Sequence, residues 1–319
     1  MSLKLPATND AAAYRRHFND VVWQQAASFI CARHHLSYNV LRRSPLGENI
    51  IFFVDDRFVI KIYAAARGQY EREAAALEFA RQARLSIETP EVVHRGELEG
   101  WSYLVMTHLA GLPMKEVWPG IAERDRLEIV SRLGVAIREL HSHEAPLSQA
   151  ALNRDWLGFI EQQARASVER QRDCGANPEW LESLPAYIDE RLPLLPSAYR
   201  SVMLHGDVHP GNLLLRQVRG RWAISLFDFG DSFCGFHEYE FVAPGVLMVQ
   251  GRREEQRALL VAYGYTQAEL DSGLRARLML LTILYECSDL RKYALRLSPE
   301  AVHLTLSELE RAIWTFVSE

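Results

Sequence analysis

The sequence predicts an α+β fold of two unequal lobes, a small antiparallel sheet followed by a larger, mainly helical region. Three observations support this prediction. The chain has 319 residues, 48% of them hydrophobic, which is enough to bury more than one core. Short runs of β-branched and aromatic residues, separated by turn residues, fill its first part. Beyond residue 110, apolar residues recur at helical spacing.

The sheet lobe is expected over residues 1–107. It starts with a helix at 10–34, where apolar residues recur at helical spacing, and a second helix is expected at 68–84. Its strands are expected at residues 39–41, 49–54, 57–63, 89–93 and 101–106, the first three as an antiparallel meander. The helical lobe, residues 108–319, includes a long amphipathic helix at 123–143 and two short strands at 212–215 and 222–227.

Charge and hydrophobicity narrow the kinds of partner and the cellular location to expect. The formal net charge of −5 argues against nucleic acid, because proteins that bind it through phosphates normally carry a basic excess. No apolar run reaches the roughly 18 residues of a membrane span, and the N-terminal residues lack the apolar core of a secretion signal. The four cysteines have no disulfide or metal spacing. We therefore expect a cytoplasmic protein without nucleic-acid or membrane partners.

The strongest chemical signal is His205-Gly206-Asp207, followed by Asn212, two apolar runs and Asp228. A His-Gly-Asp turn alone would predict only a side-chain cap. In kinases, however, an Asp orients the substrate hydroxyl, an Asn five positions later binds magnesium, and a second Asp after a hairpin joins the metal to the phosphates. This sequence has the same order and spacing, so it predicts an ATP-dependent kinase of the bilobal protein-kinase-like fold.

The chemistry explains these residue types. Phosphoryl transfer spreads negative charge over the moving group, so catalysis is mostly positioning and cation delivery. Magnesium prefers a few hard oxygen ligands and keeps some water. Asn212 and Asp228 are therefore the expected Mg²⁺ ligands, and Asp207 is the expected catalytic base.

Lys61 lies in the apolar run 58–62, where a charge is costly unless it has a partner. A kinase would use it on the ATP phosphates, whereas a lone strand lysine would extend into solvent. In the next helix, Glu73 shares a face with apolar residues and Glu71 shares one with polar residues. Glu73 is therefore the expected partner of Lys61.

Taken together, these residues resemble the aminoglycoside phosphotransferase family, a kinase-fold group that also includes choline, fructosamine and homoserine kinases. The resemblance covers nearly the whole chain. Within the family, the chain is most similar to the hygromycin kinases that modify the 7″-hydroxyl, which share the early helix and phrases such as residues 59–61, 103–106 and 204–207.

The resemblance implies a nucleotide site in detail. Residues 106–109 become the hinge, where the Thr107 carbonyl and the Leu109 amide hydrogen-bond adenine and Met106 borders the base. Leu214 and Phe227 would be apolar neighbours of the nucleotide, although either is also an ordinary core residue. ATP is the expected donor, with GTP not excluded.

Three departures from the protein-kinase pattern narrow the class of substrate. Residues 44–49 replace the glycine-rich loop, and Gly206 replaces the arginine that would hold a phosphorylated activation loop. After Asp228 the chain has no long activation segment to bind a peptide. A small-molecule acceptor is therefore expected, and no peptide substrate.

Acidic residues suggest what the acceptor carries. Asp231 and Glu238 closely follow Asp228, and Glu286 and Asp289 recur in a late helix. If they line the acceptor cleft, they favour an amine-bearing acceptor through charge-assisted hydrogen bonds. Alternatively, they are solvated charges and a helix cap, with a further residue, Glu240, standing where the family usually has a structural Asp.

The leading hypothesis is transfer of the ATP γ-phosphate to a hydroxyl of an aminoglycoside or aminocyclitol antibiotic, hygromycin-like in particular. A metabolite kinase for an amino-sugar, a choline-like compound or another small alcohol would share every motif above. A catalytically silent nucleotide-binding regulator is the non-enzymatic alternative, and the intact set of Lys61, Asp207, Asn212 and Asp228 argues against it.

Overall fold

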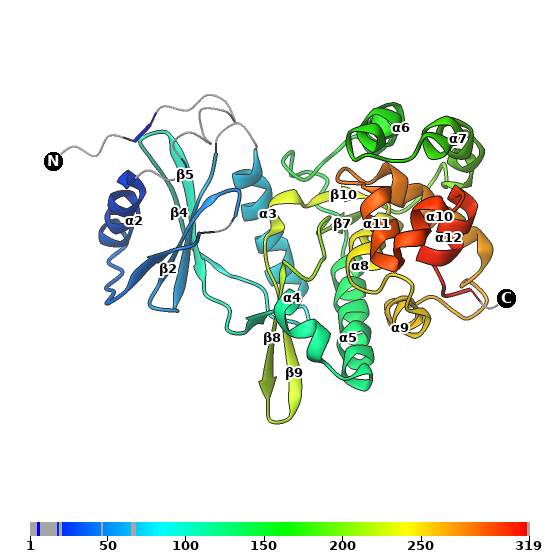
Figure 1. The fold of residues 1–319 in the computed structure, drawn as a ribbon. Helices are drawn as coiled ribbons and strands as arrows, with labels where there is room; N and C mark the ends of the chain where they lie inside the picture. Colours follow the sequence, from blue (N-terminus) through cyan, green and yellow to red (C-terminus); the bar gives the residue numbers. More distant parts are fainter. Residues whose placement is uncertain (1–4, 7–17, 19–20, 46, 65–67, 318–319) are drawn as a thin grey trace.

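The computed structural model describes residues 5–6, 18, 21–45, 47–64 and 68–317. The predicted α+β class is confirmed: an antiparallel sheet forms one side of the molecule and a group of helices the other (Figure 1). The chain leaves the large sheet where β5 ends, at Thr107. The division into lobes at this residue stays a prediction.

Five strands form the large sheet in the order β1-β2-β3-β5-β4, with every neighbouring pair antiparallel. Strands β1 to β3 form the predicted meander. The bounds are β1 Leu41–Arg43, β2 Ile50–Val54, β3 Phe58–Ile62, β4 Val92–Leu98 and β5 Trp101–Thr107.

The sheet packs against a different helix on each face. Alternate residues of β2, Ile50 and Phe52 among them, pack in one cluster with Trp23 of α2 (Val22–Arg33). The opposite face carries Lys61, and Met106 lies on that face too, because the register places Leu104 opposite Lys61. Helix α3 (Gln69–Ala83) covers this inner face, between the sheet and the other helices (Figure 1).

One contact between two helices of the helical part is so close that only glycine fits. Gly134 of α5 lies so close to α9 that a Cβ there would be 2.4 Å from the Leu259 carbonyl oxygen. The bounds are α4 Met114–Val117, α5 Glu123–Ser142, α6 Trp156–Asp173, α7 Pro178–Arg191, α8 Val242–Leu247, α9 Arg253–Tyr263, α10 Ser272–Leu284, α11 Leu290–Leu297 and α12 Leu306–Ile313.

Two small sheets complete the fold. One has the order β6-β8-β9, and the other pairs β7 with β10. The β8–β9 hairpin continues by one bond, from the Phe227 amide to the Asn212 carbonyl (3.1 Å), so Asn212 and Asp228 leave it at the same end. The bounds are β6 Leu112–Pro113, β7 Val202–Leu204, β8 Leu213–Val218, β9 Arg221–Leu226 and β10 Phe233–Gly235.

Several elements differ from the expected ones. Strand β1 begins at Leu41, because the backbone N–H groups of Asn39 and Val40 bond to the Asp55 carboxylate. Strand β4 runs from Val92 to Leu98 with polar residues on its more exposed side, which hid it in the sequence. Residues 10–17, 19 and 20 of the first expected helix lie outside the described residues. No helix in the described part of the chain is long and apolar enough to cross a membrane.

Candidate active site

Asp207 and Asn212 lie together in the loop between β7 and β8. The Asn212 side-chain amide donates to the Asp207 carboxylate oxygen Oδ2 (2.9 Å) and to the Asp207 carbonyl (3.0 Å). The five-residue spacing noted in the sequence therefore brings these two side chains into contact. Since the Asn212 amide nitrogen is occupied, its oxygen is the atom left for a cation.

Gly206 is required by the shape of this loop. Its φ of 81° is left-handed, and a Cβ there would lie 2.8 Å from the Asp231 carbonyl oxygen. An arginine at this position would be strained and would collide with backbone. The absence of the kinase arginine therefore follows from packing as well as from the missing activation segment.

The Glu240 carboxylate anchors this loop through hydrogen bonds. This buried carboxylate accepts the backbone N–H groups of His205 (2.6 Å) and Gly206 (3.0 Å), and His141 Nε2 lies 3.4 Å away. Hydrogen bonds to an ionised acceptor are roughly twice as strong as neutral ones. Glu240 therefore anchors the residues that precede Asp207, a structural role that the sequence indicated.

The His205 imidazole joins this loop to the strand that leads to Asp228. Its Nδ1 accepts the Asp207 N–H (3.2 Å), so Nε2 must carry the proton that it donates to the Phe227 carbonyl (3.1 Å). Its ring also packs edge-on against Phe229, with the ring centroids 4.5 Å apart. One side chain thus sets the spacing between the two expected catalytic segments.

Lys61 contacts two carboxylates. Its ammonium lies 2.6 Å from Glu73 Oε2 and 2.6 Å from Asp228 Oδ1, and the Tyr63 hydroxyl donates to the same Glu73 oxygen (2.7 Å). The expected pair with Glu73 is present, whereas Glu71 is exposed. Burial disfavours the charge on Lys61, but the two carboxylates raise its pKa overall. Lys61 therefore stays charged.

Asp228 adopts a left-handed backbone (φ 67°), which costs about 1–3 kcal/mol for a residue other than glycine. Loss of hydration opposes its charge, yet Lys61 lowers the pKa of its carboxyl overall. Its side chain is 45% exposed. This ionised, accessible carboxylate and the Asn212 amide oxygen are hard donors of the kind that Mg²⁺ prefers.

The described residues contain no group of three or more His, Cys, Asp or Glu that could hold a metal by itself. Magnesium usually binds one or two carboxylates and shares its remaining positions with substrate phosphates and water, so the residues present fit it. Asn212 and Asp228 would hold the ion, which would supply charge neutralisation.

Of the expected nucleotide neighbours, one residue lies on the inner face of the large sheet. Met106 is buried on the side of the sheet that carries Lys61. Thr107 ends β5, and the His108 amide between it and Leu109 donates to the Arg57 carbonyl (2.9 Å). Two more, Leu214 of β8 and Phe227 after β9, are half-buried. Their contacts with adenine stay predictions.

Two residues that contact Asp207 were not predicted from the sequence. Tyr285, directly after α10, donates its hydroxyl to Asp207 Oδ1 (3.0 Å), and His209 Nε2 lies 3.3 Å from Oδ2. Loss of hydration raises the pKa of Asp207, but the contacts with His209 and Tyr285 lower it overall. His209 lies inside the motif, which is a signal that could have found it. No motif near Tyr285 in the sequence indicates its contact with Asp207.

Two of the four expected acceptor residues remain accessible. Asp231 is exposed and accepts a hydrogen bond from Gln69 (3.2 Å). Glu286, whose side chain is 54% exposed, forms a long ion pair with Arg154 (3.4 Å). Glu286 directly follows Tyr285, the residue that contacts Asp207.

The other two expected acceptor residues have structural partners instead. Glu238 is buried, and the Arg277 guanidinium binds both of its carboxylate oxygens at 2.7 to 3.1 Å. Asp289 caps α11 by accepting the Lys292 N–H (2.8 Å). Because Arg277 binds both oxygens of Glu238 and Asp289 serves as a helix cap, the structure favours the alternative of a structural charge and a helix cap for these two residues.

Next to Glu238, a half-buried histidine makes stability depend on pH. Nε2 of His237 lies 3.0 Å from the Tyr265 hydroxyl, and its ring stacks on Tyr263. Burial, with smaller contributions from the charges of His141 and Arg277, lowers the pKa of His237 from 6.5 to about 4. The unfolded chain therefore binds a proton more readily between these two pH values.

We expect the free energy of unfolding to fall as the pH drops from 6.5 toward 4, by about 2 kcal/mol from His237 alone. This stability is present above pH 6.5, where the imidazole is neutral in both states. Denaturant unfolding at about pH 7 and about pH 4.5 should show a smaller acid loss for His237→Gln than for the wild type. Equal losses in the two proteins would contradict this assignment.

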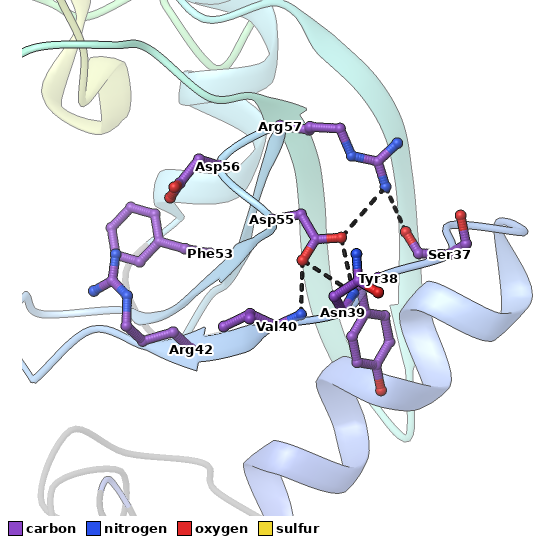
Figure 2. A pocket seen from close by; sticks show the side chains of 9 residues that line it. All are labelled: Ser37, Tyr38, Asn39, Val40, Arg42, Phe53, Asp55, Asp56 and Arg57. Carbon is purple, nitrogen blue, oxygen red and sulfur yellow. Dashed lines mark hydrogen bonds and ion pairs between the residues drawn. The ribbon is translucent and has the colours of Figure 1, made fainter.

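A large hollow of about 720 Å³ lies away from these residues, beside β1 and the β2–β3 turn (Figure 2). Several of its polar groups have partners: Asp55 accepts the N–H groups of Asn39 and Val40 and faces Arg57, while the Arg42 guanidinium stacks on the Phe53 ring at 4.4 Å. None of the predicted site residues lines this hollow, and we assign it no chemistry.

Comparisons with known proteins agree with this geometry. A family model described as "Phosphotransferase enzyme family" matches residues 45–280. A structure of the gentamicin–APH(2″)-IIa complex aligns with a TM-score of 0.61 at 18% identity, covering 92% of this chain and 98% of the other.

Two further solved structures are similar. The GDP complex of wild-type aminoglycoside 2′-phosphotransferase-IIIa has a TM-score of 0.65 at 14% identity, covering 92% of this chain and 98% of that one. Aminoglycoside-3′-phosphotransferase of type VIII has a TM-score of 0.57 at 20% identity, covering 82% and 98%. At these identities the structures establish a shared kinase-like fold.

Proposed function

Since the chain belongs to the phosphotransferase enzyme family and is a small-molecule kinase, we propose that it transfers the γ-phosphoryl group of ATP to a hydroxyl of an aminoglycoside or aminocyclitol antibiotic. Hygromycin-like aminocyclitols are the first candidates, on the sequence resemblance. In this proposal Asp207 is the base that orients the acceptor hydroxyl, and Asn212 and Asp228 bind Mg²⁺.

The observation that supports this function best is the pair of contacts made by Lys61. One ammonium lies 2.6 Å from Glu73 on α3 and 2.6 Å from Asp228 beside the catalytic loop. Protein kinases need both the Lys–Glu pair and the metal-binding Asp in place at once. Lys61 would contact the phosphates, and Met106, Thr107 and Leu109 would bind the base.

Three facts support an antibiotic acceptor. Similar structures hold gentamicin, streptomycin with ATP, or kanamycin with GDP. Asp231 and Glu286 remain accessible for amines. The chain between Asp228 and the short helix η5 (His237–Phe241) is brief and forms β10, which leaves no segment there for a peptide.

One observation favours a second candidate, the metabolite kinase. Arg277 binds Glu238, Asp289 caps α11, and Arg154 lies beside Glu286, so fewer carboxylates are free for an acceptor than the sequence suggested. An acceptor with an anionic group as well as an amine would suit Arg154 and Glu286 together.

An acceptor panel tests the proposal. Purified protein with Mg-ATP is given hygromycin B, gentamicin, kanamycin, streptomycin, glucosamine, choline and homoserine, and ADP release and product mass are followed. We expect acceptor-dependent turnover with an aminocyclitol or aminoglycoside. Turnover of a metabolite but no antibiotic would establish the second candidate instead. ATP binding without any transfer would indicate the silent regulator.

A further inference from the structure

Both oxygens of the Asp207 carboxylate are held, but by different parts of the chain. Oδ2 faces Asn212 (2.9 Å) and His209 (3.3 Å), which belong to the same loop. Oδ1 accepts the Tyr285 hydroxyl (3.0 Å), which comes from the end of α10, 78 residues away. Tyr285 is therefore the contact that fixes the carboxylate relative to the body of the helical part.

Tyr285 is itself held firmly. Its side chain is 5% exposed, and it directly follows residues 278–284 of α10, all of which are buried. Its ring packs at 5.6 Å on Tyr239, whose ring packs at 5.6 Å on Trp156. The Tyr285 carbonyl also accepts the Ser288 N–H (2.9 Å). A hydroxyl on such a support has little freedom to move away.

The hydroxyl is a permanent donor. Burial and the nearby Asp207 charge raise the pKa of Tyr285 well above its ordinary value, so the phenol stays protonated. Toward a carboxylate, a protonated phenol acts as a donor. Its other acceptor, the Gly206 carbonyl, is farther away (3.5 Å) than Asp207 Oδ1 (3.0 Å), so the carboxylate is the preferred partner.

We propose that Tyr285 is a positioning residue for phosphoryl transfer, whose hydroxyl sets the rotation of the Asp207 carboxylate so that a lone pair faces the acceptor hydroxyl. This inference rests on the proposed role of Asp207. If the carboxylate rotated freely, its basic lone pair would point away from the acceptor hydroxyl for part of the time. Misorientation of a catalytic group by more than about 10–20° reduces catalysis.

The chain offers a matched control. Tyr239 is a buried tyrosine of the same aromatic cluster, but its hydroxyl accepts the Glu286 N–H (3.3 Å) and does not contact Asp207. Tyr285→Phe and Tyr239→Phe each delete one buried phenol oxygen and keep the ring. Thermal unfolding of both variants checks that they fold.

We expect Tyr285→Phe to lower kcat about tenfold, the size of one hydrogen bond to a charged group, with KM for ATP changed less than about twofold. Tyr239→Phe should stay within about twofold of wild type in both constants. The rates are measured with the fastest acceptor of the panel and also with water as acceptor, so every preparation gives a value. Equal kcat in the two variants would overturn the inference.

A double-mutant cycle separates positioning from general support. In an Asp207→Asn background, Tyr285→Phe should change the residual rate less than about twofold, because the group it positions is gone. A full tenfold effect in that background would show a structural role and overturn the inference while leaving the proposed function intact. Wild-type turnover by Asp207→Asn alone would instead remove the role of Asp207, and with it this inference.

Discussion

Replacing Asp207 by asparagine is expected to lower kcat for phosphoryl transfer about a thousandfold, with ATP affinity nearly unchanged. The change keeps the shape of the side chain, and an amide oxygen can still accept the Tyr285 hydroxyl, but the base that orients the acceptor is lost. Positioned acid–base groups contribute about 10²–10⁴ in rate. Steady-state kinetics with the fastest acceptor, together with nucleotide binding by calorimetry, measures both parts.

Asp289→Asn is the control for this experiment. Asp289 caps α11 and asparagine caps helices equally well, so the variant should keep wild-type kinetics. A kcat above one tenth of wild type for Asp207→Asn would show that Asp207 is not the base, whatever the acceptor.

Replacing Arg277 by methionine is expected to destabilise the fold by about 3 kcal/mol. Glu238 has a side chain only 3% exposed, and Arg277 binds both of its oxygens. Removing the guanidinium leaves a buried carboxylate with one weak contact, the Tyr265 hydroxyl at 3.4 Å. The free energy of unfolding, from denaturant titration at pH 7, reports this loss.

Arg165→Met is the control, because Arg165 pairs with Glu161 at 3.2 Å on the exposed surface of α6 and the change should cost less than about 1 kcal/mol. Adding Glu238→Gln to the Arg277→Met variant should restore much of the stability by removing the uncompensated charge. If Arg277→Met unfolds like the control, Glu238 does not depend on Arg277, and its assignment to the acceptor cleft regains support.

The sequence could predict the parts of the site that are set locally. Asp207 and Asn212 touch because five residues of one loop separate them. The choice of Glu73 over Glu71 needed only the periodicity of one helix, since an inward-facing carboxylate shares its face with apolar residues. The β8–β9 hairpin, whose apolar runs are short and bounded by polar residues, was equally visible.

What the sequence could not show depends on contacts between distant segments. Tyr285 reaches Asp207 only because α10 ends beside the catalytic loop. No residue spacing in the sequence predicts this contact. A count of acidic residues gave Glu238 and Asp289 the same weight as Asp231, because a charge is visible in the sequence and its partner is not. Strand β4 was predicted too short because Arg95 and Glu97, on its more exposed side, interrupt the apolar run.

The position of Lys61 has a further consequence. This lysine of the large sheet binds one carboxylate from α3, Glu73, and one from the segment after β9, Asp228. Withdrawing Glu73 would break a buried ion pair and leave Lys61 with Asp228 alone, and breaking a buried pair costs about 3–5 kcal/mol. The arrangement that a kinase needs is then also the one that folding favours. We expect such an enzyme to be active as soon as it has folded, and its activity in a cell to follow the amount of protein made.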